Sequence, residues 1–468
     1  MELQDGKPRR KATPLEPEKE IAAGTRTLVV GPYLSRSGKL SSSAKGDTPE
    51  NPRAPEARLE EASGLAAAID LDVIHAGIAS LPAIRPSTYL GKGKVEEFGE
   101  FIHENRIDLV VMDCALSPVQ QRNLEKQWNA KVIDRTGLIL EIFGRRAHTR
   151  EGSLQVELAH LTYQKGRLVR IWTHLERQRG GFGFLGGPGE TQIEADRRQI
   201  QERMNRIERD LETVVQTRTL HRSKRKRVPY PIIALVGYTN AGKSTLFNRL
   251  TQAEVLAEDM LFATLDPTTR AVSLPHGSKV ILSDTVGFIS DLPTTLVAAF
   301  RATLEDVVEA DVLLHVRDIS HGESDAQASD VETVLEELGI PPGGKRIIEV
   351  WNKADLLPQH ERIMLSGKYH LQHGSGETPV LISALTGEGL DDLYSEIERR
   401  ISGSRPVYSL SVPSEDGKSI AWLYENTEVL DRRFQEDTSA TILVIRVAPE
   451  KESRFLAKFP DARRRPQS

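Results

Sequence analysis

The sequence predicts a multidomain α/β protein, and three observations support that fold class. The chain has 468 residues, which is more than one hydrophobic core usually serves, so two to four domains are expected. Stretches typical of strands alternate with helical stretches between residues 57 and 134. A buried-type strand also leads into the loop Gly237-x-x-x-x-Gly242-Lys243-Ser244 and then into an amphipathic helix.

The overall composition narrows the kind of protein. With 38% hydrophobic and 28% charged residues, the chain has the composition of an ordinary globular protein. It holds no apolar run of membrane-spanning length and no apolar block near its start, so we expect a cytoplasmic protein without membrane insertion. The single cysteine, Cys114, excludes an internal disulfide and a cysteine-based zinc site. A net charge of -5 argues against nucleic-acid binding over the whole surface and leaves local patches open.

Four segments are predicted along the chain. Residues 1–56 form a mostly disordered extension, rich in Ser, Pro, Gly and charge, with a first strand near 25–34. Residues 57–228 form an N-terminal α/β domain with a small sheet of parallel strands. Residues 229–402 form a central P-loop domain, a mostly parallel sheet with helices on both faces. Residues 403–468 form a small C-terminal α+β domain with a disordered tail.

A long helical hairpin is predicted to end the N-terminal domain. Apolar residues at helical spacing run to about Trp172, and a second, highly charged helix follows from Glu190. Between them, "ERQRGGFGFLGGPGE" (176–190) contains seven Gly or Pro in fifteen residues and is predicted to be the hairpin's tip. The basic stretch "HRSKRKR" (221–227) is interpreted as a linker into the central domain.

The loop that begins at Gly237 indicates phosphate binding. Its glycines allow backbone amides to turn inward around phosphates, beside a helix N-terminus. Lys243 is predicted to bridge the β- and γ-phosphates and the Ser244 hydroxyl to ligate Mg²⁺. A chance match on a glycine turn is the alternative. The nucleotide contacts predicted here are Gly237, Tyr238, Thr239, Asn240, Ala241, Gly242, Lys243, Ser244 and Thr245.

Two further motifs, each at the end of a β-type run, specify the nucleotide. In Asp284-Thr285-Val286-Gly287, Asp284 can reach the Mg²⁺ shell and the Gly287 amide can sense the γ-phosphate. In Asn352-Lys353-x-Asp355, the Asp355 carboxylate can accept two hydrogen bonds from guanine that adenine does not offer, which selects GTP. A later stretch supplies Ser383, Ala384 and Leu385 to the base. Each short motif alone could be a surface turn, and their order favours GTP binding.

The residue after Gly287 bears on the hydrolysis rate. Phe288 stands where small signalling GTPases carry a glutamine that orients the attacking water. A phenyl ring can neither donate nor accept that hydrogen bond. We therefore expect a GTPase that is slow alone and is stimulated by a partner.

The glycine-rich tip has features of an RNA contact. From 145 to 189 the chain carries eight Lys or Arg against three Glu, a local net charge of +5. Phe182 and Phe184, beside Arg177 and Arg179, could stack on unpaired bases while the arginines contact phosphates. The alternative is that both phenylalanines fold back onto the protein. Residues 91–94 ("GKGK") are a second candidate RNA contact, with an ordinary strand-to-helix turn as the alternative.

Five stretches together resemble the HflX family of ribosome-associated GTPases, which are Obg-HflX-like and of the translation-factor class. They are "RGGFGFLGGPGETQIEADRR", "GYTNAGKST", "LFATLDPTTR", "DTVGFISDLP" and "LVAAFRATLEDV", within a resemblance that covers about 57–430. The resemblance implies that switch I comprises Phe262, Ala263, Thr264, Leu265 and Asp266. It also implies that Thr264 is the second protein ligand of Mg²⁺ beside Ser244. Sequence reasoning alone does not choose Thr264 over Thr268 or Thr269.

The resemblance also implies a potassium site and a partner. Asn240 matches a P-loop asparagine that helps to hold K⁺ in several related GTPases, with a satisfied turn asparagine as the alternative. The implied partner is the large (50S) ribosomal subunit, with the tip directed toward rRNA. The implied role is ribosome splitting or rescue under stress, or ribosome biogenesis, with Lys243, Thr264 and Gly287 as the catalytic positions. We expect a monomer.

Two other functions stay open at this point. One is a nucleotide-locked rRNA-binding scaffold, which Phe288 would permit because that scaffold need not hydrolyse GTP rapidly. The other is an ATP-using RNA remodelling enzyme, against which Asp355 speaks.

Overall fold

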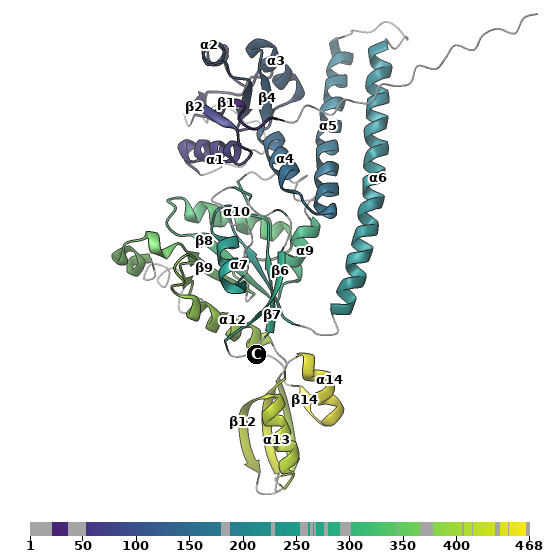
Figure 1. Cartoon of the computed structure of the whole chain (residues 1–468), viewed down its shortest axis with the longest axis vertical. Coiled ribbons are helices and arrows are strands. Elements are labelled where there is room, and N and C mark those ends of the chain that lie inside the picture. The colour runs from purple at the N-terminus through teal and green to yellow at the C-terminus, as the bar shows by residue number, and fades with distance from the viewer. Residues whose placement is uncertain are drawn as a thin grey trace, which may run out of the picture. The chain divides into compact units, whose positions relative to one another are not determined.

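The structure of the protein is a computed structural model (Figure 1). It describes residues 21–35, 53–178, 188–225, 230–252, 261–262, 265, 268–275, 279–290, 301–344, 346–365, 378–404, 407–413, 415–435, 440–447 and 449–464.

The chain folds into two compact units. The first unit holds the described residues up to 35 together with Ala54–Ile142 and Glu157–Arg209. The second unit holds Arg53, Phe143–Val156 and the described residues from Asp210 onward. Each unit is described below by itself.

The first unit is built on a four-stranded sheet in which all neighbouring strands are parallel, in the order β2-β1-β3-β4. Leu28 and Val30 of its central strand lie in the core beneath α2 and α3, while α1 packs on β1 and β2. The elements are β1 (Arg26–Leu34), α1 (Pro55–Ala67), β2 (Asp72–Leu81), α2 (Lys92–Glu104), β3 (Leu109–Met112), α3 (Pro118–Trp128) and β4 (Lys131–Asp134). The predicted open parallel sheet is confirmed. The strand expected near 25–34 lies in the middle of that sheet.

Local sequence accounts for the helix starts in this sheet. Pro118 follows Ser117, whose hydroxyl accepts a hydrogen bond from the Gln120 amide while the Gln120 side chain accepts one from the Ser117 amide. This reciprocal capping satisfies two amide groups that a helix N-terminus otherwise leaves without a partner. The capped helix predicted from this stretch is therefore present as α3.

Three helices follow, namely α4 (Arg135–Arg146), α5 (Arg150–Gln178) and α6 (Pro188–Arg225). Within the first unit, α5 and α6 run side by side (Figure 1), and Lys165 bonds Gln201 while Arg203 pairs with Glu157 at 2.7 Å. The residue numbers of these partners run in opposite directions along the chain, so the pair is antiparallel. The hairpin prediction is confirmed for these helices, and its tip at 179–187 lies outside the described residues.

One buried carboxylate ties α5 to the sheet. Asp134, at the end of β4, accepts a hydrogen bond from the Tyr163 hydroxyl at 2.6 Å and is paired with Arg167 at 2.8 Å. It also accepts from the amides of Leu116 at 3.1 Å and Gly137 at 2.8 Å. With four donors on a side chain that is 3% exposed, the base of the hairpin is held to the end of the sheet.

The second unit contains a six-stranded sheet in the order β10-β9-β8-β5-β7-β6, parallel except for the antiparallel edge pair β6 and β7. Its elements are β5 (Ile232–Val236), α7 (Lys243–Thr251), β6 (Thr268–Ser273), β7 (Lys279–Asp284), α9 (Arg301–Glu309), β8 (Val312–Asp318), α10 (Ser324–Glu337), β9 (Ile347–Asn352), the 3-10 helix η2 (Ala354–Leu356), β10 (Val380–Leu381) and α12 (Leu390–Ser404).

Helices cover both faces of this sheet, as predicted. Phe247 of α7 and Ile397 of α12 join the core on one face with Leu235 and Leu314. On the other face, α9 packs on β5 and α10 packs on β8. Because the central strands are buried on both sides, they read as continuous apolar runs in the sequence. Their carboxyl ends lie together at one edge, and the candidate site lies there.

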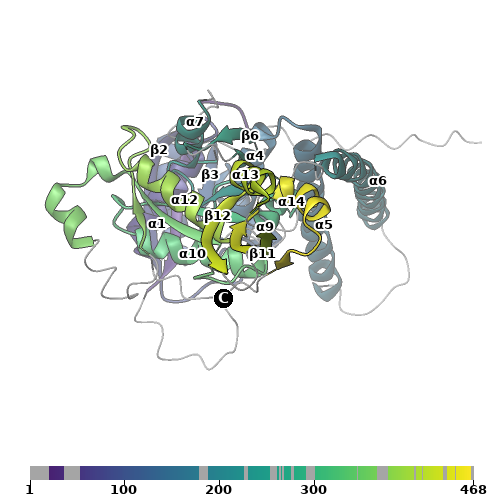
Figure 2. The same ribbon diagram turned by 90° about the horizontal axis from the view of Figure 1, so that it is seen from below.

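The last domain contains a four-stranded antiparallel sheet in the order β12-β13-β11-β14. Figure 2 labels its strands β11 and β12 together with its helices α13 and α14. Its elements are β11 (Val407–Pro413), α13 (Gly417–Asn426), β12 (Glu428–Gln435), β13 (Ala440–Arg446), α14 (Pro449–Lys458) and β14 (Arg463–Arg464). Leu423 of α13 and Phe455 of α14 are fully buried against Leu443 and Ile445. The predicted α+β class holds for this domain.

Three local expectations differ from the structure. Arg463–Arg464 pair with β11 inside the stretch expected to be a disordered tail, since β11 offers them an unpaired edge. Helix α6 runs to Arg225, through most of the expected linker, because charged long-chain residues favour helix. It also starts at Pro188, inside the expected loop, where proline suits the first helical turn.

Candidate nucleotide-binding site

The loop between β5 and α7 requires glycine at two positions. Gly237 has φ 150°, and a Cβ there would lie 2.2 Å from the Val316 carbonyl oxygen. Gly242 has φ 89°, and its Cβ would lie 2.2 Å from Nδ2 of Asn352. Neither approach is possible for a residue with a side chain. The alternative of a chance glycine turn is thus disfavoured, because both glycines are packed against neighbouring strand ends.

Asn240, between these glycines, lies in the left-handed region with φ 61°. Asparagine tolerates this conformation better than most residues do. The structure therefore supplies a reason for the asparagine as a turn residue, and a role in holding K⁺ stays a prediction.

Lys243 lies inside the loop. Its ammonium group donates to the Tyr238 carbonyl at 2.7 Å, and the residue is 6% exposed. Burial lowers the pKa of Lys243 to about 8, against a smaller opposing effect of the Asp284 carboxylate. A buried ammonium group at the N-terminus of α7 forms a cationic centre suited to a polyphosphate.

Ser244 and Asp284 lie face to face. The Ser244 hydroxyl donates to Oδ2 of Asp284 at 2.8 Å, and Asp284 is fully buried at the end of β7. Two adjacent oxygen ligands of this kind suit a hard divalent cation such as Mg²⁺. Thr264, the predicted second protein ligand of Mg²⁺, lies outside the described residues, as do Ala263 and Asp266.

The segment after Asp284 is docked on the phosphate loop by its main chain. The Phe288 amide donates to the Gly237 carbonyl at 3.1 Å, and the Thr239 amide donates to the Phe288 carbonyl at 2.7 Å. The Phe288 ring is 2% exposed, so it packs in the protein. Thr285 and Val286 are also buried, and the Thr285 hydroxyl bonds the Leu235 carbonyl. These three side chains therefore support the loop from within.

Asn352 joins three loops. Its Nδ2 donates to the Ala241 carbonyl at 2.8 Å, and its Oδ1 accepts from the Ala384 amide at 2.9 Å. The amide thereby connects the phosphate loop, the end of β9 and the loop after β10. Sequence reasoning placed Asn352 at the base and missed this connecting role, although an amide offers both a donor and an acceptor.

The other residues predicted to contact the guanine base lie in the loops that Asn352 connects. Lys353 adopts φ 64° and pairs with Asp318 at 2.7 Å. Asp355 is half-buried in η2, Ser383 is fully buried, and Leu385 is 72% exposed. The structure therefore brings the three predicted motifs together at the carboxyl ends of β5, β7 and β9.

Two residues of the predicted switch I are described. Leu265 and Phe262 are each 2% exposed. The Phe262 ring packs edge-on against Phe143 of α4, with ring centroids 4.8 Å apart and an interplanar angle of 79°. This edge-to-face contact is a favourable aromatic arrangement.

A second cluster of polar side chains lies in the second unit. His315, Glu332 and Glu349 have potential ligand atoms within 4.8 Å of one another. Burial, and then the charges of Arg317 and Lys243, lowers the pKa of His315 to about 3. Nη1 of Arg317 lies 3.6 Å from Glu349 and competes with a metal ion for that carboxylate. We therefore assign no metal to this group.

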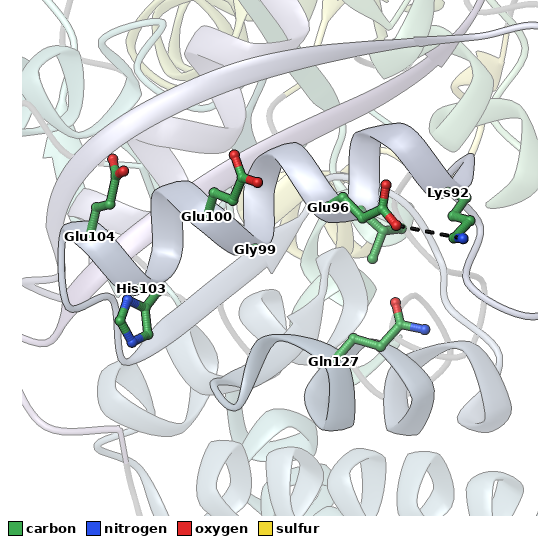
Figure 3. Close-up of a pocket in the computed structure, with 8 residues that line it drawn as sticks. Lys92, Glu96, Gly99, Glu100, His103, Glu104 and Gln127 are labelled. Carbon is green, nitrogen blue, oxygen red and sulfur yellow. Dashed lines mark ion pairs between the residues drawn. The ribbon is translucent and has the colours of Figure 1, made fainter.

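An open hollow of about 570 Å³ lies over α2 and α3 in the first unit (Figure 3). Glu96, Glu100 and Glu104 project from α2 there, and Lys92 pairs with Glu96 at 3.7 Å. Lys94 pairs with Glu97 at 2.7 Å, and Gly91 is the N-cap of α2. The stretch 91–94 is thus a turn into a helix with its lysines ion-paired, and RNA contact by it stays a prediction.

A glycine loop packed on neighbouring strands, a buried lysine and facing serine and aspartate oxygens define a P-loop nucleotide-binding site. The comparisons with known proteins agree. The chain matches the family models "GTP-binding GTPase N-terminal" at 56–144, "GTP-binding GTPase Middle Region" at 146–225, "50S ribosome-binding GTPase" at 232–353 and "HflX C-terminal domain" at 371–463.

Curated relatives named GTPase HflX are similar over most of the chain. The relative from Magnetococcus marinus is 51% identical over 391 residues, covering 84% of this chain and 88% of the relative. The relative from Escherichia coli is 42% identical over 389 residues, covering 82% and 89%. The chain belongs to the HflX family of GTPases, as the sequence analysis expected.

One solved structure and the absence of a membrane-spanning helix among the described residues are two further findings. A solved GTP-binding protein from Sulfolobus solfataricus, in complex with GDP, matches with 23% identity and a TM-score of 0.41, and the match covers 80% of this chain and 98% of that protein. Within the part of the chain that the structure describes, no helix combines the length and apolarity needed to span a membrane.

Proposed function

We propose that this HflX-family GTPase is a nucleotide-controlled switch that binds the large ribosomal subunit through its helical hairpin. In this proposal it acts in splitting or rescue of ribosomes under stress, or in their biogenesis. One observation above all supports this proposal: a single chain combines a GTPase site with a hairpin whose segment 145–189 has a net charge of +5.

The site residues have distinct proposed roles. The Lys243 ammonium group contacts the β- and γ-phosphates, and the Gly287 amide donates a hydrogen bond to the γ-phosphate when GTP is bound. Ser244 and Asp284 would hold Mg²⁺, which fits their facing oxygens 2.8 Å apart and would neutralise charge on the phosphates. Thr264 is proposed as the second protein ligand of that ion on the family resemblance.

Guanine selection is assigned to Asp355, with Lys353, Ser383, Ala384 and Leu385 around the base. Asn352 holds these loops together through its bonds to Ala241 and Ala384. A carboxamide has two N–H donors and two acceptor lone pairs, so Asn352 is also proposed to contact the base.

The proposed RNA contacts are Arg177, Arg179, Phe182 and Phe184, at the tip of the hairpin. Support comes from the anchoring of α5 on Asp134, which gives the arm a firm base. The family model "50S ribosome-binding GTPase" at 232–353 supports the choice of the large subunit as the partner.

The decisive experiment measures GTP hydrolysis with and without purified large ribosomal subunits, using small subunits as the control. We expect a sharp rise with large subunits alone. Equal rates under all three conditions would contradict the proposed partner.

Phe288 gives one alternative some support. Its ring is buried, so that side chain does not orient an attacking water. A scaffold that binds rRNA while a nucleotide locks its conformation would hydrolyse GTP slowly even on the subunit. Single-turnover hydrolysis on large subunits separates the two functions, because the switch accelerates there and the scaffold does not.

A further inference from the structure

Arg53 is an N-terminal residue that packs in the GTPase unit. It directly precedes Ala54, where the chain enters the first unit, but its own contacts group it with the second. Its side chain is 2% exposed, which is unusual for an arginine and requires charged or polar partners.

The guanidinium group of Arg53 has such partners on two sides. Its Nε lies 2.7 Å from Oε2 of Glu323, just before α10, and its Nη1 lies 4.0 Å from Oδ2 of Asp330. The same Nη1 donates to the Tyr238 hydroxyl at 2.8 Å. The two carboxylates thus fix the position of the group that holds the tyrosine.

Tyr238 belongs to the phosphate loop and contacts the segment after Asp284 twice. Its hydroxyl accepts from the Ser290 amide at 2.7 Å, and its backbone pairs with Phe288. Its carbonyl accepts from Lys243 at 2.7 Å. A single residue therefore connects Arg53 to both the phosphate lysine and the segment 287–290.

This docked segment sits tightly on the loop. A Cβ at Gly287 would lie 2.9 Å from Nζ of Lys243 and 2.9 Å from Cα of Thr239. A γ-phosphate that contacts both Lys243 and the Gly287 amide must enter between these groups, so the segment has to move away from the loop. The bond from Tyr238 to Ser290 resists that movement.

We propose that Arg53 is a positioning residue that holds the segment 287–290 in its docked conformation, through the Tyr238 hydroxyl, and so disfavours GTP relative to GDP. The proposal rests on GTP binding by the family, which its members' name states, and does not depend on a ribosomal partner.

The test compares affinities for GDP and a non-hydrolysable GTP analogue in the full chain. Arg53→Lys keeps the charge beside Glu323 but loses the planar pair of donors, and Tyr238→Phe removes only the shared hydroxyl. Each variant is expected to raise the ratio of analogue affinity to GDP affinity by about tenfold, the value of one charge-assisted hydrogen bond. The double variant is expected to give no further rise over Tyr238→Phe, because Arg53 acts through the hydroxyl that this substitution already removes.

The matched control is Arg58→Lys, five residues along the chain, where the guanidinium lies 4.3 Å from the centroid of the Tyr33 ring in the first unit. This control is expected to leave the ratio unchanged. An unchanged ratio in Arg53→Lys, or effects of the two substitutions that simply add, would overturn the proposal. Should Arg53→Lys fail to fold, an unchanged ratio in Tyr238→Phe would overturn it equally.

Discussion

The nucleotide site and the hairpin base are held by different kinds of bond. In the site, main-chain groups of the phosphate loop pair with main-chain groups of Phe288, and glycines fit where no side chain can. At the hairpin base, the Asp134 side chain gathers Tyr163 and Arg167 across about thirty residues of sequence. The glycine positions follow from a short motif in the sequence, whereas the partners of a side-chain anchor follow only from the finished fold.

The largest expected effect tests the backbone half of this comparison. Gly242→Ala should weaken GDP binding at least about a hundredfold, because alanine is strained at φ 89° and its Cβ would meet Asn352. Titration with a fluorescent GDP analogue measures this. Gly144→Ala is the control, since a Cβ there meets nothing within 4 Å and no loss is expected. Similar affinities for both variants would refute the steric reading of the loop.

The next largest effect is expected on the preference for guanine over adenine nucleotides when Asp355 is substituted. Asp355→Asn is expected to reduce the preference for GTP over ATP by about a hundredfold, because the paired acceptance from guanine is lost. Competition of GTP and of ATP against bound GDP measures the preference in each protein. A variant that kept the wild-type preference would show that another residue reads the base.

The side-chain half of the comparison predicts a change in stability without a change in binding. Asp134→Asn should lower the unfolding free energy of the first unit by about 3 kcal/mol, since it leaves Arg167 without its buried partner. Hydrogen exchange of the β3 and β4 amides would report this, with GDP affinity unaltered. Arg203→Ala, at an exposed pair, should cost below about 0.5 kcal/mol. Equal losses of protection in the two variants would argue against Asp134 as the anchor.

The smallest effect concerns pH. Burial lowers the pKa of Lys243 to about 8, so in the free protein this group loses its positive charge as pH rises through 8. Nucleotide binding must then restore the proton, and GDP affinity should fall about tenfold from pH 7 to pH 9. Lys243→Ala should bind weakly at both pH values and lack this slope. A slope that persisted in the variant would assign it to another group.

The same comparison explains what the sequence could predict. The strand ends, the glycines and the order of the motifs were readable because each depends on neighbours within a few residues. The bonds of Asn352 to Ala241 and Ala384, and of Arg53 to Tyr238, were not readable, since they join residues 111, 32 and 185 positions apart. Arg225 ends a helix where a linker was expected, because charge alone does not distinguish a solvated helix from a linker.

In the proposed function, the bound nucleotide controls whether the charged hairpin binds rRNA. Co-sedimentation with large ribosomal subunits tests it, using the intact chain and a variant with Arg177, Arg179, Phe182 and Phe184 all replaced by alanine. The account predicts strong binding of the intact chain with a non-hydrolysable GTP analogue, weak binding with GDP, and loss of the difference in the variant. Equal sedimentation of both proteins with either nucleotide would contradict it.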